Sequence, residues 1–366
     1  MVAEQPIILV MAAGTGGHVF PALAIARKME ALGAKIEWLG TRRGMENELL
    51  AGMGMHIHHI SVSGLKGSGL VRKLKAPFML LTALVQSMRI IGTVRPDCVL
   101  GMGGFVCGPG GLAAKLMGKP LFIHEQNAIA GITNRILSRF ANRVFESFPN
   151  TFKSAAKVVY TGNPLREEII ALHSHSVVAT DPQKALRILV LGGSQGAAAI
   201  NTAIPAMLAQ WDSTSRPQVL HQTGKRAINE TRAIYQEAGL RLSAEIRVVP
   251  FINDMADAYQ WADLVVCRSG ASTVSEIAAA GLPSILVPYP YHSDQQQLHN
   301  ANWLVNGGAA ELLEQTALTP DSLLQKVQGL HLDRQHLASM RMAAHNMAIC
   351  NASDVIAKSC LEARNV

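Results

Sequence analysis

Glycines and a histidine follow the first apolar segment of the chain. The run Ile7–Met11 leads into a loop that contains Thr15, Gly16 and Gly17, and His18 stands where the next helix should begin. Backbone N–H groups at such a turn favour an oxygen-rich ligand. The positive end of a helix disfavours imidazolium, so a neutral His18 can accept a proton from a substrate hydroxyl. The alternative is a histidine that only hydrogen-bonds to a neighbouring loop.

The same loop resembles the dinucleotide-binding pattern G-x-G-x-x-G without completing it. Val19 stands at the third glycine position, and Glu37 lies inside the next apolar segment, 36–39, rather than at its end. That third glycine allows close helix–strand packing, and the acid would bind the ribose. We therefore do not expect an NAD site. A tight turn without a ligand is the remaining alternative.

Four polar residues follow a buried apolar segment at 121–123. They are His124, Glu125, Gln126 and Asn127. Polar residues placed directly after a buried strand favour a binding or catalytic site over an ordinary loop.

A second glycine loop, 192–196, follows the apolar run 188–191 and contains Ser194. Its backbone N–H groups and the Ser194 hydroxyl suit a phosphate at the start of a helix. A turn with a capping serine is the plainer alternative. The loop lies at the end of a strand, where open α/β sheets place their ligands.

Small polar residues also follow the apolar run 264–267. We interpret them as a helix N-terminus that attracts a phosphate, with Glu276 accepting hydrogen bonds from ribose hydroxyls. The alternative is structural, because Thr273 and Glu276 have the spacing of a capping box. Asp294 and Gln297 have the same spacing, and they either cap a helix or bind sugar hydroxyls.

Histidines are also dense at positions 56, 58 and 59. His56 and His58 would share one face of a strand, as metal ligands can. No third type of ligand accompanies them in the sequence, so we predict no metal site.

The segment 65–89 mixes basic with apolar residues. One interpretation is a core helix with a solvated basic edge. The other is a patch that binds an anionic membrane surface reversibly, at about 1 kcal/mol per basic residue. The basic residues lack the interleaved aromatic residues of a nucleic-acid binder, so no nucleic acid is expected. The predicted membrane patch comprises Arg72, Lys73, Lys75, Phe78 and Leu81.

The cysteines and the apolar segments predict the cellular compartment of the protein. Five cysteines, with no C-x-x-C pair, predict a reducing cytosol and no disulfide framework. The N-terminus lacks the basic region of a signal peptide. Gln86, Ser87 and Arg89 interrupt the longest apolar stretch, 76–94, so we do not expect it to span a membrane.

The elements that position these residues repeat along the chain. It has 366 residues, 49% apolar and 16% charged, which is typical of a globular protein of about two domains. Apolar strands, glycine turns and helices alternate, first at 10–17 and again at 190–196. This pattern predicts two Rossmann-like α/β domains with parallel sheets that face each other across a cleft. A net charge of +7 favours an anionic partner.

Taken together, these motifs resemble the MurG family of bacterial N-acetylglucosaminyltransferases. The resemblance runs from the N-terminus to about Gly308 and implies the GT-B glycosyltransferase fold. The dipeptide Asn163-Pro164 disfavours continued regular structure, so we predict domains at 1–164 and 165–344, with a helix at about 345–366 that packs back on the first. The resemblance implies that the first domain binds the acceptor and the membrane and that the second binds the donor. The motifs that carry it are GTGGHVFP (14–21), GMGGFVCGPGG (101–111), HEQN (124–127) followed by Gly131, GNPLR (162–166), LGGSQGA (191–197), FINDM (251–255) and residues 267–283.

The resemblance also implies roles for individual residues. His18 matches the family's proposed general base, and Glu125 belongs to the same acceptor-side catalytic cluster. Phe105 replaces a common tyrosine, so any role of that hydroxyl is absent. The positions that match donor-contacting residues are Thr15, Gly16, Gly17, Asn127, Arg166, Ser194, Ile252, Ala271, Ser272, Thr273, Val274, Ser275, Glu276, Gln296 and Gln297.

The implied reaction moves N-acetylglucosamine from UDP-N-acetylglucosamine to the C4 hydroxyl of N-acetylmuramic acid in lipid I, which gives lipid II for peptidoglycan synthesis. The enzyme would work as a peripheral protein on the cytoplasmic face of the cell membrane. No cofactor or metal is expected, because no Asp-x-Asp pair is present to hold a metal–diphosphate complex.

Two alternatives remain. One is a UDP-N-acetylglucosamine 2-epimerase of the same architecture, which would need no lipid patch. The other is a non-enzymatic membrane scaffold, which would leave the polar strand ends unexplained.

Overall fold

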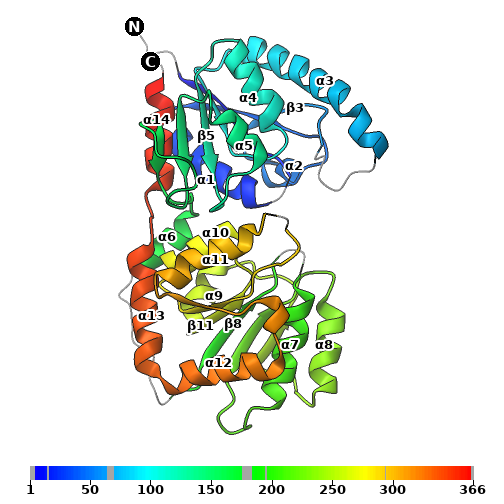
Figure 1. Ribbon diagram of the computed structural model, residues 1–366, viewed down its shortest axis with the longest axis vertical. Coiled ribbons are helices and arrows are strands. Elements are labelled where there is room, and N and C mark those ends of the chain that lie inside the picture. The colour runs from blue at the N-terminus through cyan, green and yellow to red at the C-terminus, as the bar shows by residue number, and fades with distance from the viewer. Residues whose placement is uncertain are drawn as a thin grey trace. The chain divides into compact units, whose positions relative to one another are not determined.

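The computed structural model describes residues 5–14, 16–63, 70–174, 184–193, 196–292 and 294–363, with the backbone alone at 70–75. The chain forms two compact units (Figure 1). The first contains Met1–Arg166 and Ile349–Val366, and the second contains Glu167–Ala348. Each unit is built on one parallel sheet, which confirms the predicted fold class of two Rossmann-like domains. The boundary lies two residues beyond the predicted one.

The sheet of the first unit has the strand order β3-β2-β1-β4-β5-β6-β7, and every pair is parallel. Strands β1, β4 and β5 lie in the middle, buried on both faces, which explains their continuous apolar sequences. The strands are β1 Ile7–Met11, β2 Lys35–Gly40, β3 His56–His59, β4 Cys98–Gly101, β5 Leu121–Glu125, β6 Arg143–Glu146 and β7 Val158–Tyr160.

Helices cover both faces of this sheet. Ile8 and Val10 of β1 point into one core, and Leu9 and Met11 point into the other, as the period of two requires. The first core contains residues of α1 and α14, and the second contains residues of α3 and α4. The helices of this unit are α1 Gly16–Ala31, α2 Glu46–Leu49, α3 Leu70–Val94, α4 Cys107–Leu116, α5 Ile132–Leu137 and α14 Ala352–Glu362.

The C-terminal segment belongs to both units in turn. Helix α13 (Arg334–Met347) lies in the second unit, and α14 lies in the first, where it runs beside α1 (Figure 1). Ile356, Ala357 and Cys360 of α14 are buried in the same core as Ile8 and Val10. The last helix is therefore part of the core of the N-terminal unit.

The sheet of the second unit has the order β10-β9-β8-β11-β12-β13, again all parallel. Its strands are β8 Arg187–Leu191, β9 Gln218–Gln222, β10 Ile246–Val249, β11 Leu264–Cys267, β12 Ser284–Leu286 and β13 Ala310–Leu312. Its other helices are α6 Glu167–His173, α7 Ala198–Ala209, α8 Ile228–Glu237, α9 Met255–Trp261, α10 Ala271–Ala279, α11 Gln296–Asn306, the 3-10 turn Gln315–Ala317 and α12 Pro320–Leu332.

Helix α3 has two unlike faces. Ala83, Ser87 and Ile91 recur every four residues and are buried against the unit, whereas Phe78 and Leu81 are 76% and 60% exposed. By length and composition alone, its stretch Ala76–Val94 would be sufficient to cross a membrane. The described part of the outer face carries exposed apolar residues together with the exposed Thr82, Arg89 and Thr93. The basic residues of the two sequence interpretations lie mostly among side chains outside the described residues.

Candidate active site

The carboxyl ends of β1 and β4 place two glycine loops around His18, the third residue of α1. A Cβ atom built on Gly103 would lie 3.3 Å from Cε1 of His18, and one on Gly104 would lie 3.6 Å from its Cδ2. Both glycines have a positive backbone φ, +87° and +77°, which residues with a side chain rarely adopt. The imidazole therefore rests on a surface that only glycine can form.

Gln126 determines the tautomer of His18. Its Nε2 donates a hydrogen bond to the carbonyl oxygen of Met102 at 2.9 Å, so its Oε1 is left to accept. That oxygen lies 3.1 Å from Nδ1 of His18. Nδ1 must then carry the proton, and Nε2 of the neutral imidazole keeps its lone pair. This is the state that a general base requires.

His124 and Glu125 are both buried at the end of β5, but they differ in charge and in hydrogen bonding. Burial lowers the pKa of His124 to about 4, so its imidazole is neutral at physiological pH. Glu125 accepts hydrogen bonds from the backbone N–H groups of Asn127 and Gly131, both at 3.1 Å, and from Nδ2 of Asn134 at 3.0 Å. Its carboxylate thus holds the loop that leads into α5 in place.

Of the other predicted residues in this loop system, Gly16 and Gly17 form the first turn of α1. Asn127 is partly buried, and its side-chain amide lies 3.3 Å from Oε1 of Glu125. Thr15 lies outside the described residues. Arg166 ends the N-terminal segment of the first unit, whereas most of the positions predicted to contact the donor lie in the second unit.

Glu46 is a residue of this region that the sequence did not single out. It is fully buried, and its carboxylate accepts hydrogen bonds from the backbone N–H of Thr41 at 2.7 Å and of Gly14 at 3.2 Å. A Cβ on Gly44 would overlap this carboxylate. Glu46 therefore joins the loops that follow β1 and β2. The sequence gives no signal of it, because the bond to Gly14 spans 32 positions.

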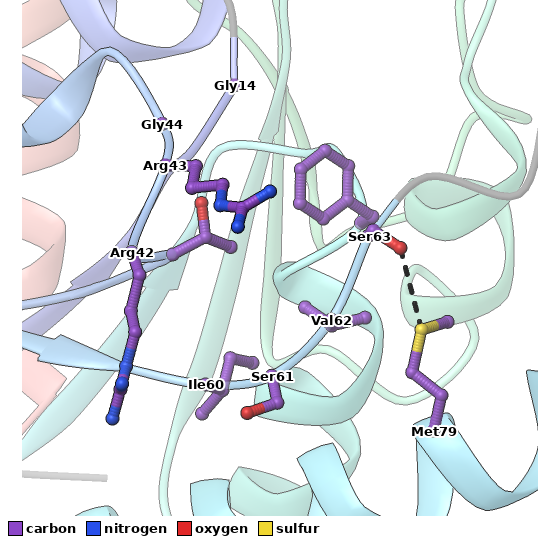
Figure 2. A pocket seen from close by; sticks show the side chains of 11 residues that line it. Gly14, Arg42, Arg43, Gly44, Ile60, Ser61, Val62, Ser63 and Met79 are labelled. Atoms are coloured by element: carbon purple, nitrogen blue, oxygen red, sulfur yellow. Dashed lines mark hydrogen bonds between the residues drawn. The ribbon is translucent and has the colours of Figure 1, made fainter.

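A cavity of about 460 Å³ opens beside these loops in the first unit. Figure 2 shows Arg43 extending across it toward an aromatic ring, while Arg42 extends in another direction. Both arginines are exposed at the carboxyl end of β2, and neither was predicted as a site residue. The cavity is lined by Gly14, Thr41, Arg42, Arg43, Gly44, Ile60, Ser61, Val62, Ser63, Met79 and Phe105.

In the second unit, the side chain of Gln222 braces the glycine loop after β8. Its Oε1 accepts from the backbone N–H of Gly193, and its Nε2 donates to the carbonyl of Gly193, each at 3.0 Å. A Cβ on Gly196 would lie 2.7 Å from the carbonyl oxygen of Thr223. The backbone of this loop thus lies close to that of Thr223, which leaves no room for a side chain at position 196. Ser194 lies outside the described residues.

Helix α10 begins without a capping side chain. Its N-cap is Gly270, which shows that the predicted capping box of Thr273 and Glu276 is wrong. Both residues lie inside the helix, and the first turn carries no acidic residue. Backbone N–H groups of a first turn have no partner within the helix. This helix start is therefore suited to an anionic group.

The residues of α10 separate into two sets by burial. Ser272, Thr273 and Glu276 are partly accessible, whereas Ala271, Val274 and Ser275 are buried. The Ser275 hydroxyl donates to the carbonyl of Ala271 at 3.0 Å. The helix therefore offers a ligand the side chains of the first set.

Glu276 is fixed by a neighbouring tyrosine. The hydroxyl of the buried Tyr259 donates to Oε2 of Glu276 at 2.9 Å. Arg268, just before α10, donates instead to the carbonyl oxygens of Val287 and Pro288 at 3.0 and 3.1 Å. Tyr259 therefore orients a carboxylate at the helix, and Arg268 anchors the adjacent loop.

The remaining predicted donor residues lie in loops and helix starts of the second unit. Ile252 is partly exposed after β10. Gln296 is the first residue of α11, and Asp294 accepts from its Nε2 at 3.1 Å. Gln297 accepts from the backbone N–H of Tyr289 at 2.9 Å. Neither Asp294 nor Gln297 caps α11, because the N-cap is Gln295.

Both units match known sequence families and proteins. Residues 8–146 match the N-terminal domain of glycosyltransferase family 28, and residues 187–356 match its C-terminal domain. The chain is 49% identical over 355 residues to a protein of Azotobacter vinelandii, covering 97% of this chain and 98% of the relative. That relative is named UDP-N-acetylglucosamine--N-acetylmuramyl-(pentapeptide) pyrophosphoryl-undecaprenol N-acetylglucosamine transferase.

Solved structures agree with these matches. The crystal structure of Acinetobacter baumannii MurG superposes with a TM-score of 0.82 at 41% identity, covering 98% of this chain and all of that one. A UDP-N-acetylglucosamine 2-epimerase, at 13% identity and a TM-score of 0.64 over 96% of this chain and 95% of that one, shares the fold alone. The epimerase alternative is therefore not favoured. The chain belongs to glycosyltransferase family 28, as the resemblance to MurG predicted.

Proposed function

We propose that this enzyme transfers N-acetylglucosamine from UDP-N-acetylglucosamine to the C4 hydroxyl of the N-acetylmuramic acid of lipid I. Its membership of family 28 and the names of its relatives support this reaction. The observation that carries the proposal is the pair His18–Gln126, which leaves Nε2 of a neutral imidazole as a base at the carboxyl edge of the first sheet.

The chemistry is a single displacement. The acceptor oxygen forms a bond to C1 of N-acetylglucosamine as the bond from C1 to the UDP oxygen breaks, so an α-linked donor gives a β-linked product. Nε2 of His18 takes the hydroxyl proton, and UDP departs with the bonding electron pair. The transition state resembles an oxocarbenium ion, as in other glycosyl transfers.

The second unit supplies the donor site in this proposal. The start of α10 presents backbone N–H groups toward the diphosphate, where negative charge develops, and the glycine loop after β8 lets a ligand approach the backbone closely. The carboxylate of Glu276, oriented by Tyr259, accepts hydrogen bonds from the ribose hydroxyls. Ile252 contacts the uracil, and Gln297 is placed to reach the sugar.

The cavity beside Arg42 and Arg43 is suited to the diphosphate of the acceptor. Two exposed guanidinium groups and the hydroxyls of Ser61 and Ser63 offer donors to phosphate oxygens. Met79 of α3 lines the same cavity, which links this polar region to the apolar helix. A phosphate in the cavity would leave the polyprenyl chain next to α3.

The test supplies the purified enzyme with UDP-N-acetylglucosamine labelled in the sugar and with lipid I in mixed micelles. We expect labelled lipid II and UDP in equal amounts, and the same rate after treatment with EDTA, because helix starts rather than a metal hold the leaving group. Epimerised donor formed without acceptor would favour the epimerase instead. Turnover that is lost with EDTA and restored by Mg²⁺ would overturn the metal-free mechanism.

We also propose that the first unit attaches reversibly to the anionic cytoplasmic leaflet of the cell membrane. Exposed large apolar side chains lie on α3, α4 and α5, and α4 packs against both of the other helices. Large exposed apolar patches on a soluble protein mark interaction sites. The side chains of Arg72, Lys73 and Lys75 lie outside the described residues, so their role stays a prediction. The apolar residues are Phe78, Leu80, Leu81 and Val85 of α3, Leu112 and Leu116 of α4, and Ile132 and Ile136 of α5.

Replacing Phe78 and Leu81 together by serine should weaken vesicle binding about tenfold or more, since burying each side chain contributes about 1.5–3 kcal/mol. Flotation with vesicles of anionic lipid measures this loss. The exposed Leu332, in the second unit, is the matched control and should have no effect as Leu332→Ser. Equal binding by the double variant and the wild type would contradict the assigned surface.

A further inference from the structure

A group of three ligand atoms lies at the outer edge of the first sheet. Glu37 is on β2, and His56 and His58 are on the edge strand β3. Glu37 pairs with His56 in the register of the two strands, and Leu39 pairs with His58. Residues that pair across two strands, or stand two apart in one strand, point to the same face. The backbone thus brings all three side chains to one face.

The reactive atoms converge closely. Oε2 of Glu37 lies 3.2 Å from Nδ1 of His56 and 2.8 Å from Nε2 of His58, and the two nitrogens are 3.1 Å apart. The Glu37 side chain is 8% exposed and that of His58 is 16%, whereas that of His56 is 68% exposed. Glu37 and His58 are therefore shielded from water, and His56 lies on the solvent side of the group.

Two of these separations, 3.2 and 3.1 Å, are close to the distance between ligands of a tetrahedral metal ion, and the third, 2.8 Å, is shorter. Ligands about 2.0–2.2 Å from a tetrahedral zinc ion lie about 3.3 Å from one another. Two ring N–H groups that both donate to Oε2 account for two edges of the triangle, but the two donating nitrogens are then left facing each other at 3.1 Å. Oε1 of Glu37 is held by Nζ of Lys35 at 2.8 Å, which leaves Oε2 as a single ligand atom directed at the histidines.

We propose that Glu37, His56 and His58 form a binding site for a divalent transition metal, with Zn²⁺ the ion that best suits two imidazoles and one carboxylate. A hollow of about 530 Å³ borders the group, with Glu30, Glu37 and His56 among its lining residues. It leaves room for water as the fourth ligand, as three-ligand zinc sites have.

The site is structural rather than catalytic. Glu37 and His56 lie toward the amino ends of their strands, whereas the loops around His18 follow the carboxyl ends of β1 and β4. Strand β3 has four residues and, among the described strands, pairs with β2 alone. A metal bound by both strands would fasten this short edge strand to β2.

The test uses protein without a histidine tag, stripped with EDTA and then freed of chelator. Titration with Zn²⁺ alone, followed by calorimetry, should show one equivalent of tight binding. Co²⁺ should give the visible absorption of a tetrahedral site. Zinc should also slow hydrogen exchange of the β3 amides, a readout that does not depend on turnover.

Three variants remove one ligand each, Glu37→Gln, His56→Gln and His58→Gln, and each should lose the equivalent of tightly bound zinc. His59→Gln is the matched control, because His59 is next in the strand but pairs with Asn47 instead. His56→Gln alters the most exposed side chain of the group and is therefore the variant expected to disturb folding least. Its zinc binding tests the proposal even if another variant fails to fold. Absence of zinc binding in the wild type, or equal binding by His56→Gln, would overturn the proposal.

Discussion

The variant His18→Ala should turn over about 10²–10⁴-fold more slowly than the wild type, with little change in KM for UDP-N-acetylglucosamine. In the proposed mechanism the imidazole takes a proton as the acceptor oxygen attacks. This interaction exists only in the transition state, so its loss should lower kcat. Initial rates of lipid II formation at saturating concentrations of both substrates measure it.

A control variant shows whether the loss of turnover is specific to His18. His336→Ala is the control, because His336 is exposed on α13 in the second unit. Near-normal turnover by His18→Ala would show that another group, or water, removes the proton.

The second large effect is expected from Glu276→Ala, which should raise KM for the donor about ten- to a hundredfold. Hydrogen bonds to a charged group contribute about 1.5–3 kcal/mol each, and 1.4 kcal/mol corresponds to a factor of ten. The proposed hydrogen bonds to the ribose would be equally strong in the ground and transition states, so kcat should change much less than KM. Steady-state kinetics with varied UDP-N-acetylglucosamine measures both quantities.

Two companion variants make the result specific. Tyr259→Phe removes only the hydroxyl that orients Glu276 and should raise the same KM by a smaller factor. Glu237→Gln, on the exposed surface of α8, should leave it unchanged. If Glu276→Ala lowered kcat and left KM unchanged, the carboxylate would have to act on the reacting atoms instead of the ribose.

The two sheets could be predicted because their physical signals are local. Strands buried on both faces, such as β1 and β8, appear as continuous apolar runs, and each is followed by glycines that permit a sharp turn. The same signals located the loops around His18 and Gly193. The start of α10 was less predictable, because Thr273 and Glu276 have the spacing of a cap but stand inside the helix.

The parts of the site that escaped prediction depend on pairs far apart in sequence. His18 and Gln126 are 108 positions apart, and no local sequence pattern predicts that their side chains are in contact. The side chains at the end of β5 are also unlike one another. Gln126 reaches His18, while Glu125 binds the following loop. In the same way, His56 and His58 gained their third partner, Glu37, only through the pairing of β2 with β3.

The placement of α14 has a consequence for synthesis of the protein on the ribosome. Residues 1–166 emerge first, yet the hydrophobic core that they form lacks Ile356, Ala357 and Cys360 until translation is almost complete. The second unit is continuous in sequence, from Glu167 to Ala348, and can finish folding earlier. Until α14 has emerged, the apolar side chains of α1 that pack against it remain uncovered.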